Sequence, residues 1–302
     1  MRICSFLPSA TEIIYMLGLE ENLFGVTHEC DYPDGAKTKP KLTQNLLNAS
    51  TSFEIDRAVR ESLKGGRGVY SINGENLRNA APDIIFTQEL CEVCAVPYGE
   101  IFRASRKLPN IPEIISLDTF TLNDILQSIG TVAKKCGKEE KGKAIIRRLE
   151  ERIDTAKQIS SSREKKRVLF IEWVNPIMSC GHWMPELIDI AGGRDLFGVN
   201  GKNSKIINWK DVLSASPDYM IIAPCGFNTA RAQEEARYLT KLEEWEGISA
   251  VRNKNVYIAD GNAHFSRPGP RIVDGLEILV SILNPSSSYA GKYGDAEYLR
   301  FS

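Results

Sequence analysis

The sequence has no strong excess of charge of either sign. Its 38 Lys and Arg residues and 39 Asp and Glu residues leave a formal net charge of -1, and no basic run breaks that balance. Proteins that bind nucleic acid or anionic membranes through electrostatic attraction carry a basic patch. The composition therefore argues against both kinds of partner.

Long hydrophobic runs and an export signal are also missing. A membrane-spanning helix needs about 18 or more apolar residues, whereas the most apolar window, residues 272–283, contains Asp274 and Glu277. The first residues lead straight into a short apolar strand and a helix, unlike a secretory signal. We therefore expect a cytoplasmic protein without a membrane span, or a periplasmic or extracellular one if export uses another route.

Motifs of several enzyme classes are absent as well. The chain contains no nucleophile elbow with Ser-His-Asp order, no P-loop and no G-x-G-x-x-G. Hydrolase, NTPase and dinucleotide-dependent activities are therefore disfavoured. We expect a binding protein without a catalytic site.

Short β-type runs alternate with helical patterns in both halves of the chain, which is typical of a parallel α/β protein. The predicted strands are 2–6, 23–26, 68–72, 83–87, 113–117, 167–173, 196–199, 219–223 and 255–260. The predicted helices are 9–17, 53–63, 77–81, 98–107, 122–135, 185–191, 209–214, 229–242 and 271–283.

One long helix, residues 138–160, separates the halves. Its apolar residues recur at spacings of three and four: Ile145, Leu149, Ile153 and Ala156. A helix of this length spans about 30 Å, the breadth of a small domain, although it also suits an ordinary surface helix. The 302 residues suit two domains. We predict lobes at 1–137 and 163–285, a connecting helix at 138–162, and a poorly ordered tail at 286–302.

The two halves repeat one another in detail. The sequence Leu-Phe-Gly-Val starts at Leu23 and again at Leu196, 173 residues later, and Pro-Asp before a buried strand occurs at Pro82 and at Pro217, 135 residues later. The two spacings differ by 38 residues, so the first half carries an insertion of that length in residues 27–68. Because insertions after strands are often functional loops, this segment is a candidate for function.

Reactive side chains follow the predicted strands. Ligands of open parallel sheets bind at the carboxyl ends of the strands. If the two lobes face each other across these edges, the side chains converge on one cleft; alternatively, the thiols are small buried hydrophobes. The residues at these positions are His28, Cys30, Cys91, Cys94, Cys180, His182, Cys225 and His264.

Seven cysteines without an export signal favour reduced thiols, metal ligands or redox chemistry over disulfides. Cys91 and Cys94 form a C-x-x-C pair that suits a metal site, a redox pair or a purely structural role. A second C-x-x-C is absent, so a zinc or iron site would need Cys30, Cys180 or His182. An intracellular metal or thiol-redox protein, which includes an enzyme of that kind, is therefore an alternative function.

Aromatic residues share the same strand ends. Flat apolar rings with a few polar groups suit a large planar ligand. Trp183 is the preferred ligand contact, because it lies in a predicted loop where burial in the core is not expected. The aromatic set is Tyr32, Tyr98, Trp173, Trp183, Phe227 and Phe265.

Four stretches carry a resemblance to a known family: residues 5–12, residues 77–86 with Pro82-Asp83, the central helix, and the run PELIDIAGG at 185–193. Over residues 2–283 the chain resembles the vitamin B12-binding proteins of ABC transporters, a class that also serves siderophores, haem and metal ions. The resemblance implies two Rossmann-like α/β lobes with mainly parallel sheets, joined by one long rigid helix, as in class III periplasmic binding proteins. Residues 28–33 and 181–183 further resemble predicted cobalamin-binding proteins without an evident export signal.

The resemblance implies a corrinoid such as cobalamin, or a related tetrapyrrole, as ligand of a monomeric protein. His182 or His28 could bind the metal axially, His264 lies at the same edge, and Arg267 or Arg271 could meet acidic groups of the ligand. A partner is also implied, namely the permease of an ABC transporter, with Glu75 and Asp211 as docking residues. A scaffold that binds a partner protein is a third possibility.

Overall fold

The computed structural model describes residues 1–65, 68–89, 96–161 and 164–301, which form two compact units. Unit 1 contains Met1–Ser50, Glu54–Thr119 and Asn123–Arg147. Unit 2 contains Thr51–Phe53, Phe120–Leu122 and Arg148–Ser302. The long helix α7 (Glu139–Ser160) begins in unit 1 and ends in unit 2, and it matches the predicted central helix.

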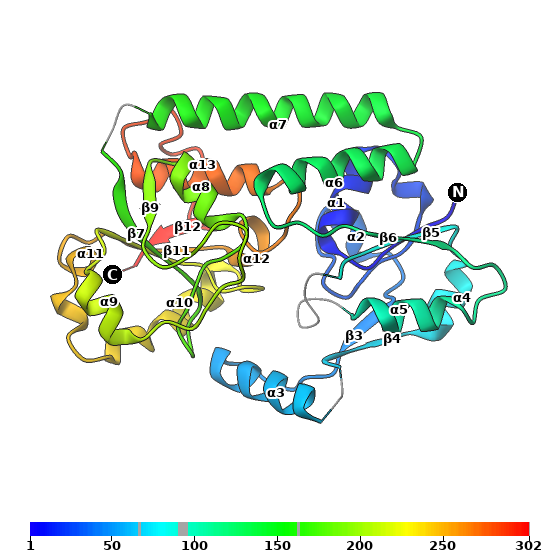
Figure 1. Ribbon diagram of the computed structural model, residues 1–302, viewed down its shortest axis with the longest axis horizontal. Helices are drawn as coiled ribbons and strands as arrows, with labels where there is room; N and C mark the ends of the chain where they lie inside the picture. Colours follow the sequence, from blue (N-terminus) through cyan, green and yellow to red (C-terminus); the bar gives the residue numbers. More distant parts are fainter. Residues whose placement is uncertain (66–67, 90–95, 162–163, 302) are drawn as a thin grey trace. The chain divides into compact units, whose positions relative to one another are not determined.

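Unit 1 is built on a four-stranded parallel sheet in the order β2-β1-β5-β6. The strands are β2 (Leu23–Gly25), β1 (Ile3–Ser5), β5 (Ile84–Thr87) and β6 (Glu113–Ser116), close to the predicted ranges. Helices α1 (Pro8–Met16) and α6 (Leu122–Lys135) cover one face, and α4 (Gly74–Ala80) and α5 (Tyr98–Ser105) cover the other (Figure 1). With helices on both faces, β5 is buried along its whole length, as expected for a parallel sheet.

The predicted insertion forms a separate substructure, most of which belongs to unit 1. After β2 come the short helix α2 (Asp34–Lys37), the strand β3 (Thr43–Asn45), the helix α3 (Ser52–Lys64) and the strand β4 (Tyr70–Ile72). The strands β3 and β4 pair antiparallel in a two-stranded sheet of their own. The predicted strand at 68–72 is therefore present, but it lies outside the parallel sheet.

Unit 2 has a six-stranded mixed sheet with β7 (Lys166–Trp173) at its centre. The strands β9 (Gly193–Asp195) and β10 (Tyr219–Ile222) pair parallel with β7, and β11 (Val256–Ala259) pairs parallel with β10. Two strands are antiparallel: β8 (Met178–Ser179) on β7 and β12 (Tyr298–Arg300) on β11.

The predicted strand at 196–199 is wrong. The strand β9 ends at Asp195, whose carboxylate accepts hydrogen bonds from the backbone N–H groups of Phe197 and Gly198. An aspartate that bonds the backbone two residues on makes a turn, so it stops the strand before the apolar residues that suggested one.

The remaining helices of unit 2 surround this sheet. The predicted helix at 229–242 is shorter, because it ends at Ala236 and a 3₁₀ turn follows at Leu239–Lys241. Further 3₁₀ turns lie at Glu20–Asn22 and Trp245–Gly247. The α-helices are α8 (Met184–Ile190), α9 (Trp209–Ala215), α10 (Thr229–Ala236), α11 (Ser249–Arg252), α12 (Gly261–His264) and α13 (Ile272–Leu283).

The internal repeat is visible in the helices that precede β5 and β10. An asparagine side chain caps the start of each helix: Asn73 accepts from the backbone of Asn76, and Asn208 accepts from that of Lys210. Each helix ends in a left-handed residue, Ala81 with φ 40° and Ser216 with φ 39°. Matching caps at both ends support duplication.

An arginine braces each of these helices to the sheet. Arg2 donates from Nε to Ala80 O at the end of α4, and its backbone N–H bonds Asp83. Arg167 donates to Ala215 O at the end of α9, and its backbone N–H bonds Asp218. Two units with the same brace at equivalent positions indicate a common ancestor for the halves.

The C-terminal segment differs from the predicted poorly ordered tail. The strand β12 pairs with β11, with Tyr257 opposite Arg300 and Ala259 opposite Tyr298. It therefore covers an edge of the sheet that would otherwise expose unpaired backbone groups. None of the helices in the described part of the chain combines the length and apolar character needed to span a bilayer.

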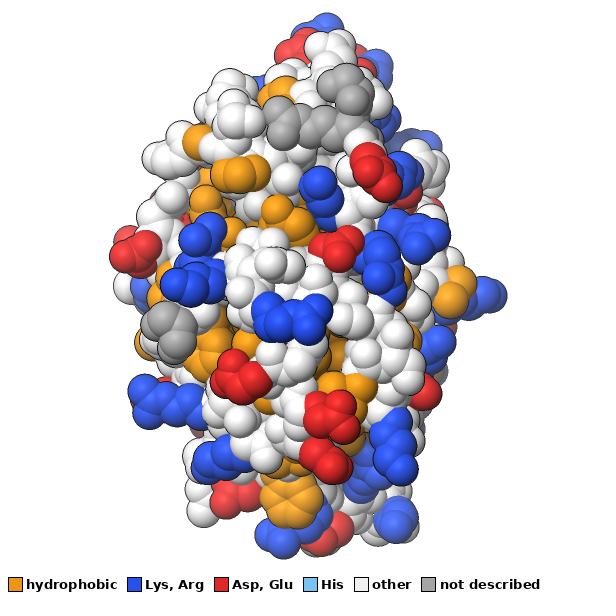
Figure 2. All heavy atoms as spheres, turned by 90° about the vertical axis from the view of Figure 1, so that its left-hand side faces the viewer, with side chains coloured by type: hydrophobic (Ala, Val, Ile, Leu, Met, Phe, Trp, Pro, Cys, Tyr) orange, Lys and Arg blue, Asp and Glu red, His pale blue; other side chains and the backbone are white. Residues whose placement is uncertain are grey.

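The surface carries mixed charge. On the face shown in Figure 2, basic and acidic side chains lie among each other without a large region of one sign. This agrees with the net charge of -1.

Candidate functional site

In unit 1, Cys30 and His28 follow β2 at the carboxyl edge of the sheet, as predicted. The Cys30 thiol lies 3.1 Å from Thr11 Oγ1 and 3.2 Å from Thr27 Oγ1, and the residue is 1% exposed. Cys30 is thus packed against the first turns of α1, where a bound ligand would not reach its sulfur.

His28 links this edge to the inserted hairpin. Its Nδ1 lies 2.7 Å from Thr43 Oγ1 of β3, and its ring packs on Tyr70 of β4 with centroids 5.3 Å apart. Its Nε2 lies 3.2 Å from Glu29 Oε1. Because both ring nitrogens face protein groups, His28 suits the positioning of the hairpin better than metal binding.

The other predicted residues of unit 1 are dispersed. Tyr32 is 46% exposed, and Tyr98, at the start of α5, stacks on Phe102 with centroids 6.4 Å apart. Glu75 is exposed in the first turn of α4. Cys91 and Cys94 lie outside the described residues.

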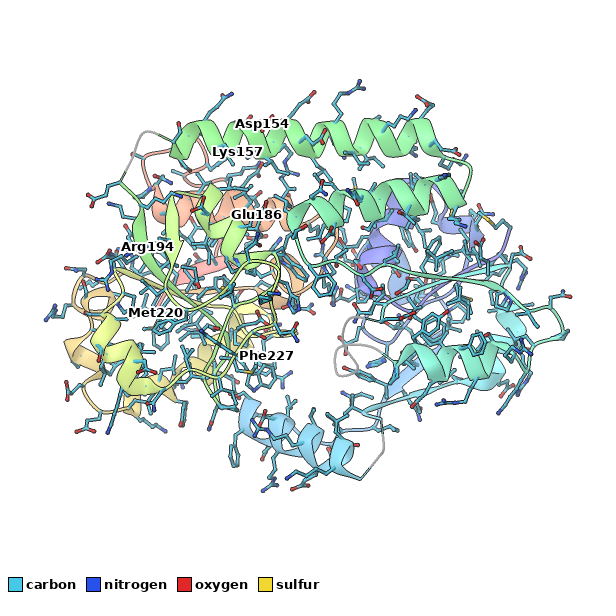
Figure 3. All side chains as sticks on the ribbon, viewed as in Figure 1. Asp154, Lys157, Glu186, Arg194, Met220 and Phe227 are labelled. Atoms are coloured by element: carbon cyan, nitrogen blue, oxygen red, sulfur yellow. The ribbon has the colours of Figure 1, made fainter. Side chains whose placement is uncertain are left out.

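In unit 2, two aromatic side chains meet at the carboxyl edge. Trp173 ends β7 and Phe227 follows β10, with ring centroids 5.4 Å apart. The Arg231 guanidinium lies 3.6 Å from the centroid of the Phe227 ring. Phe227, labelled in Figure 3, is only 2% exposed, so it supports the half-buried Trp173 and does not itself offer a surface to a ligand.

Ser52 borders Trp173 in unit 2. The Trp173 indole N–H donates to Ser52 O at 3.2 Å. The Ser52 backbone N–H and hydroxyl donate to Glu235 Oε2 at 3.1 and 2.5 Å. Ser52 starts helix α3, so its backbone N–H is one of those that a carboxylate such as Glu235 satisfies. No sequence pattern predicts this contact, because it joins residues 183 positions apart.

His182 lies close to two aromatic rings. Its ring centroid is 6.1 Å from that of Phe120 and 5.6 Å from that of Trp183. Its Nε2 lies 3.1 Å from Asn203 Oδ1. Burial lowers the pKa of His182 against the opposing effect of the Asn203 hydrogen bond, so the imidazole is neutral at neutral pH. In the tautomer that donates from Nε2 to Asn203, Nδ1 keeps a lone pair.

The prediction that Trp183 is an exposed ligand contact is wrong. Trp183 is 7% exposed, and its indole N–H donates to Phe265 O at 3.2 Å. The loop is buried because residues 202–204 cover it: a Cβ on Gly181 would lie 2.3 Å from Ser204 N. Phe265, 3% exposed, is likewise a core residue.

Arg267 and His264 face the protein interior. Arg267, 9% exposed, donates to Asn262 Oδ1 at 2.7 Å. The His264 ring packs against Tyr293 of the C-terminal segment, with centroids 6.5 Å apart, and burial lowers its pKa. The chain's own C-terminal segment thus occupies space beside His264 that was predicted for a ligand.

Cys180 does not lie at the carboxyl edge. Because β8 runs antiparallel to β7, it carries Cys180 back along the sheet, where its thiol lies 3.5 Å from Asp195 Oδ1. Burial raises the pKa of both groups, with nearby carboxylates adding to the effect on the thiol. A thiol held protonated in this way is a poor metal ligand.

The described cysteines do not support the predicted metal centre. In the ranges that the structure describes, no group of three or more His, Cys, Asp or Glu side chains is arranged to hold a metal ion. Burial raises the pKa of Cys4 to about 12 and that of Cys136 to about 11. None of the five described cysteines forms a disulfide, and Cys225 is the one of them that is partly exposed.

A family model described as periplasmic binding protein matches residues 3–263. The chain belongs to this family. The family is one of binding proteins, in agreement with the prediction that the chain has no catalytic site.

Two relatives of this binding protein cover nearly the whole chain. The vitamin B12-binding protein of Vibrio cholerae is 24% identical over 286 residues, which are 93% of this chain and 88% of the relative. An ABC transporter substrate-binding lipoprotein of Bacillus subtilis, YvrC, is 24% identical over 297 residues, which are 95% of this chain and 81% of the relative.

Solved structures share the fold of this binding protein. The periplasmic haem-binding protein RhuT from Roseiflexus sp. RS-1 superimposes with a TM-score of 0.69 at 19% identity, covering 95% of this chain and 99% of that one. The periplasmic vitamin B12-binding protein BtuF of Vibrio cholerae gives 0.68 at 22% identity, covering 95% and 98%. The predicted two-lobed fold of class III periplasmic binding proteins is thereby confirmed.

Proposed function

We propose that this solute-binding protein binds a corrinoid or a related tetrapyrrole such as haem. The observation that carries the proposal is a neutral histidine beside an exposed aromatic ring in unit 2: the ring centroids of His182 and Phe120 lie 6.1 Å apart, and Phe120 is 39% exposed. Flat rings favour a large planar ligand, and a neutral imidazole is a ligand for cobalt and iron. Relatives named for vitamin B12 and for haem support both members of this ligand class.

His182 is the axial ligand in this proposal. Burial lowers the pKa of His182, so protons compete little with a metal ion for the ring nitrogen near pH 7. The bond from Nε2 to Asn203 orients the ring and leaves Nδ1 for the metal. Trp173, half-buried on Phe227, supplies a further flat surface.

Titration of the purified protein with hydroxocobalamin and with haemin tests the proposal. We expect binding of at least one of them at micromolar concentration, with a shifted absorption spectrum. His182→Ala removes the shift that is due to axial ligation and weakens binding about tenfold or more. His28→Ala is the matched control, because the His28 ring nitrogens face Thr43 and Glu29. Absence of binding of both ligands, measured by calorimetry, refutes the proposal.

We also propose that an ABC-transporter permease is the partner, as the Bacillus subtilis relative's description suggests. The docking acids would be Glu75 and Asp211, each exposed in the first turn of one of the two equivalent helices, α4 and α9. The repeat aligns Glu75 with Lys210, because Asn73 matches Asn208. In unit 2 the docking acid Asp211 therefore lies next to the basic residue Lys210, whereas in unit 1 the equivalent position is the acid Glu75 itself. We expect substitution of the acid in unit 1 to affect docking more than substitution of the acid in unit 2.

A further inference from the structure

A cavity of about 440 Å³ lies at the amino edge of the sheet in unit 2. The strands β7, β9 and β10 begin at Lys166, Gly193 and Tyr219, and the lining residues come from the first two positions of these strands or from just before them. The cavity shares none of its described lining residues with the surroundings of His182 and Trp173, so it is a separate site. The described lining residues are Glu164, Lys165, Lys166, Arg167, Arg194 and Asp218.

Arginines on neighbouring strands bring positive charges together at this edge. The parallel pairing of β7 with β9 places Arg167 opposite Arg194, which is labelled in Figure 3. Adjacent strands lie about 4.8 Å apart, so like charges at paired positions repel each other. The Arg167 guanidinium is compensated by the backbone carbonyls of Ala215 and Ser216, to which it donates. In the described part of the chain, the Arg194 side chain has no hydrogen-bond or ion-pair partner.

The cavity therefore has positive charge and hydrogen-bond donors that the protein itself does not use. Arg167 uses two of the five N–H groups of a guanidinium. Lys166, like Arg194, pairs with no side chain of the described residues, whereas Lys165 forms an ion pair with Asp189. Guanidinium groups bind phosphate through paired, charge-assisted hydrogen bonds. With three cations available, a phosphate monoester, which carries a charge of about −2 near pH 7, suits the cavity better than a single carboxylate does.

Two carboxylates line the same cavity and restrict what accompanies the phosphate. Asp218 Oδ2 accepts the Arg167 backbone N–H at 3.1 Å, which leaves further acceptor positions on that carboxylate. Glu164 is exposed and has no partner among the described residues. Carboxylates repel an anion but accept hydrogen bonds from hydroxyl groups. Because none of the described lining residues is apolar or aromatic, the cavity suits a ligand rich in hydroxyl groups and not a flat apolar one.

We propose that this cavity binds a phosphorylated polyol, such as a sugar phosphate. Arg194 and Lys166, with the unused donors of Arg167, hold the phosphate, and Glu164 and Asp218 accept hydrogen bonds from hydroxyl groups of the same molecule. The volume of about 440 Å³ lies within the range of small-molecule sites, roughly 300–1,000 Å³. This site goes beyond the proposed function, because both its residues and its ligand class are different.

Calorimetric titrations of the intact chain with glucose 6-phosphate, inorganic phosphate and glucose test the proposal. We expect glucose 6-phosphate to bind with a Kd of about 1 mM or below. Inorganic phosphate should bind about threefold more weakly or worse, because it brings no sugar hydroxyl groups to the two carboxylates. Glucose should show no binding at the same concentrations, because it lacks the phosphate group. No binding of glucose 6-phosphate to the intact chain overturns the proposal.

Arg194→Gln tests the phosphate contact. It removes a charged, exposed donor that holds no other part of the chain, so the variant should fold and bind glucose 6-phosphate about fivefold more weakly or worse. Arg148→Gln is the matched control, because Arg148 is an exposed arginine of α7 outside the cavity, and it should change the affinity less than about twofold. Equal effects of the two substitutions overturn the proposal.

Glu164→Ala tests the recognition of the hydroxyl groups. It removes a hydrogen-bond acceptor and a negative charge, so the affinities for glucose 6-phosphate and inorganic phosphate should come within about twofold of each other. A cooperative thermal transition shows that each variant is folded. If the intact chain already binds both ligands equally well, the cavity recognises the anion alone and the assignment to a polyol is overturned. None of these outcomes bears on the binding of hydroxocobalamin or haemin.

Discussion

Glu277 of α13 connects three segments of unit 2 through one carboxylate. Arg152 of α7 donates to Oε1 at 2.8 Å, and Lys292 and Tyr293 of the C-terminal segment donate to Oε2. The side chain is 2% exposed. Burial alone would raise the pKa of Glu277, but the hydrogen bonds from Arg152, Lys292 and Tyr293 outweigh it and hold the pKa at about 2. The carboxylate therefore stays charged and paired in the folded protein.

This network predicts a dependence of stability on acid. Because the pKa of Glu277 is lowered by folding, its contribution is complete above the ordinary value of 4.5 and is lost as the pH falls toward 2. Glu277→Gln should lower the free energy of unfolding at pH 7 by about 3 kcal/mol, since it removes one partner of a buried ion pair. Below pH 4.5 the stability of the Glu277→Gln variant should also fall less steeply than that of the intact chain. Urea unfolding at pH 7, 5, 4 and 3 measures both effects.

Lys157→Gln on α7 is the matched control. Lys157 and its partner Asp154, both labelled in Figure 3, are 55% and 67% exposed. Exposed pairs contribute about 0–1 kcal/mol. If Lys157→Gln lowers the free energy of unfolding as much as Glu277→Gln does, the buried network contributes no more to stability than an exposed ion pair.

For single residues, the sequence predicted which strand a residue follows better than it predicted whether that residue is buried. His28 and Cys30 do follow β2, and Trp173 does end β7. Trp183 and Cys180 were misjudged, because their burial depends on the antiparallel return of β8 and on the cover provided by residues 202–204. Neither of these long-range contacts leaves a periodic pattern in the sequence. Asn203 and Phe120, the neighbours of His182, were missed for the same reason.

Among the elements, long periodic segments were predicted well and short ones were not. The helices α6, α7 and α13 and the buried strands β1, β5, β7 and β10 carry clear apolar patterns. The strands β3, β8 and β12 are not buried along their length, so none of them carries the continuous apolar run that predicts a buried strand. The C-terminal strand was missed because its Ser- and Gly-rich approach resembles a disordered tail.

The C-terminal segment is expected to be needed for stability. Truncation after Asn284 removes β12, the partner of the β11 edge, and with it the two donors Lys292 and Tyr293 to Glu277. We expect a loss of about 3–5 kcal/mol in the free energy of unfolding, because Glu277 keeps only Arg152 as partner. The exposed β11 edge should also promote association. Urea unfolding and size-exclusion chromatography measure these effects.

Arg300→Ala separates the two contributions of the C-terminal segment. It removes the contact of Arg300 with the Tyr257 hydroxyl but leaves the backbone pairing of β12 and the Glu277 network. It should cost about 1 kcal/mol or less. A truncated chain as stable as the intact one would mean that the segment is an appendage after all.

For the whole molecule, the internal repeat was more informative than any single motif. Two echoes, at Leu23 and Leu196 and at Pro82 and Pro217, predicted two similar halves and an insertion of 38 residues. The structure matches them with equivalent capped helices and arginine braces. Repeats can be recognised in a sequence because they depend only on the order of the residues. The ligand and the partner are harder to read, because they depend on side chains brought together only by folding.

The repeat also leads to a prediction about the permease. Glu75 and Lys210 occupy equivalent positions on α4 and α9, and Asp211 is the exposed acid next to Lys210. Opposite charges on neighbouring residues weaken the field that an arginine on a partner would meet. Glu75→Lys should therefore reduce ligand-stimulated ATP hydrolysis by the reconstituted transporter at least fivefold, and Asp211→Lys should reduce it less than twofold. Neither substitution should change ligand affinity.

Glu139→Lys on α7 is the control for this experiment. Glu139 is also an exposed acid in the first turn of a helix, so its reversal alters the local helix dipole interaction in the same way. ATP hydrolysis should respond to Glu75→Lys and not to Glu139→Lys if docking uses the acid of α4. Equal loss from both reversals would point to general charge repulsion. Equal loss from Glu75→Lys and Asp211→Lys would instead mean that Lys210 does not mask its neighbour and that both units dock through acids of similar weight.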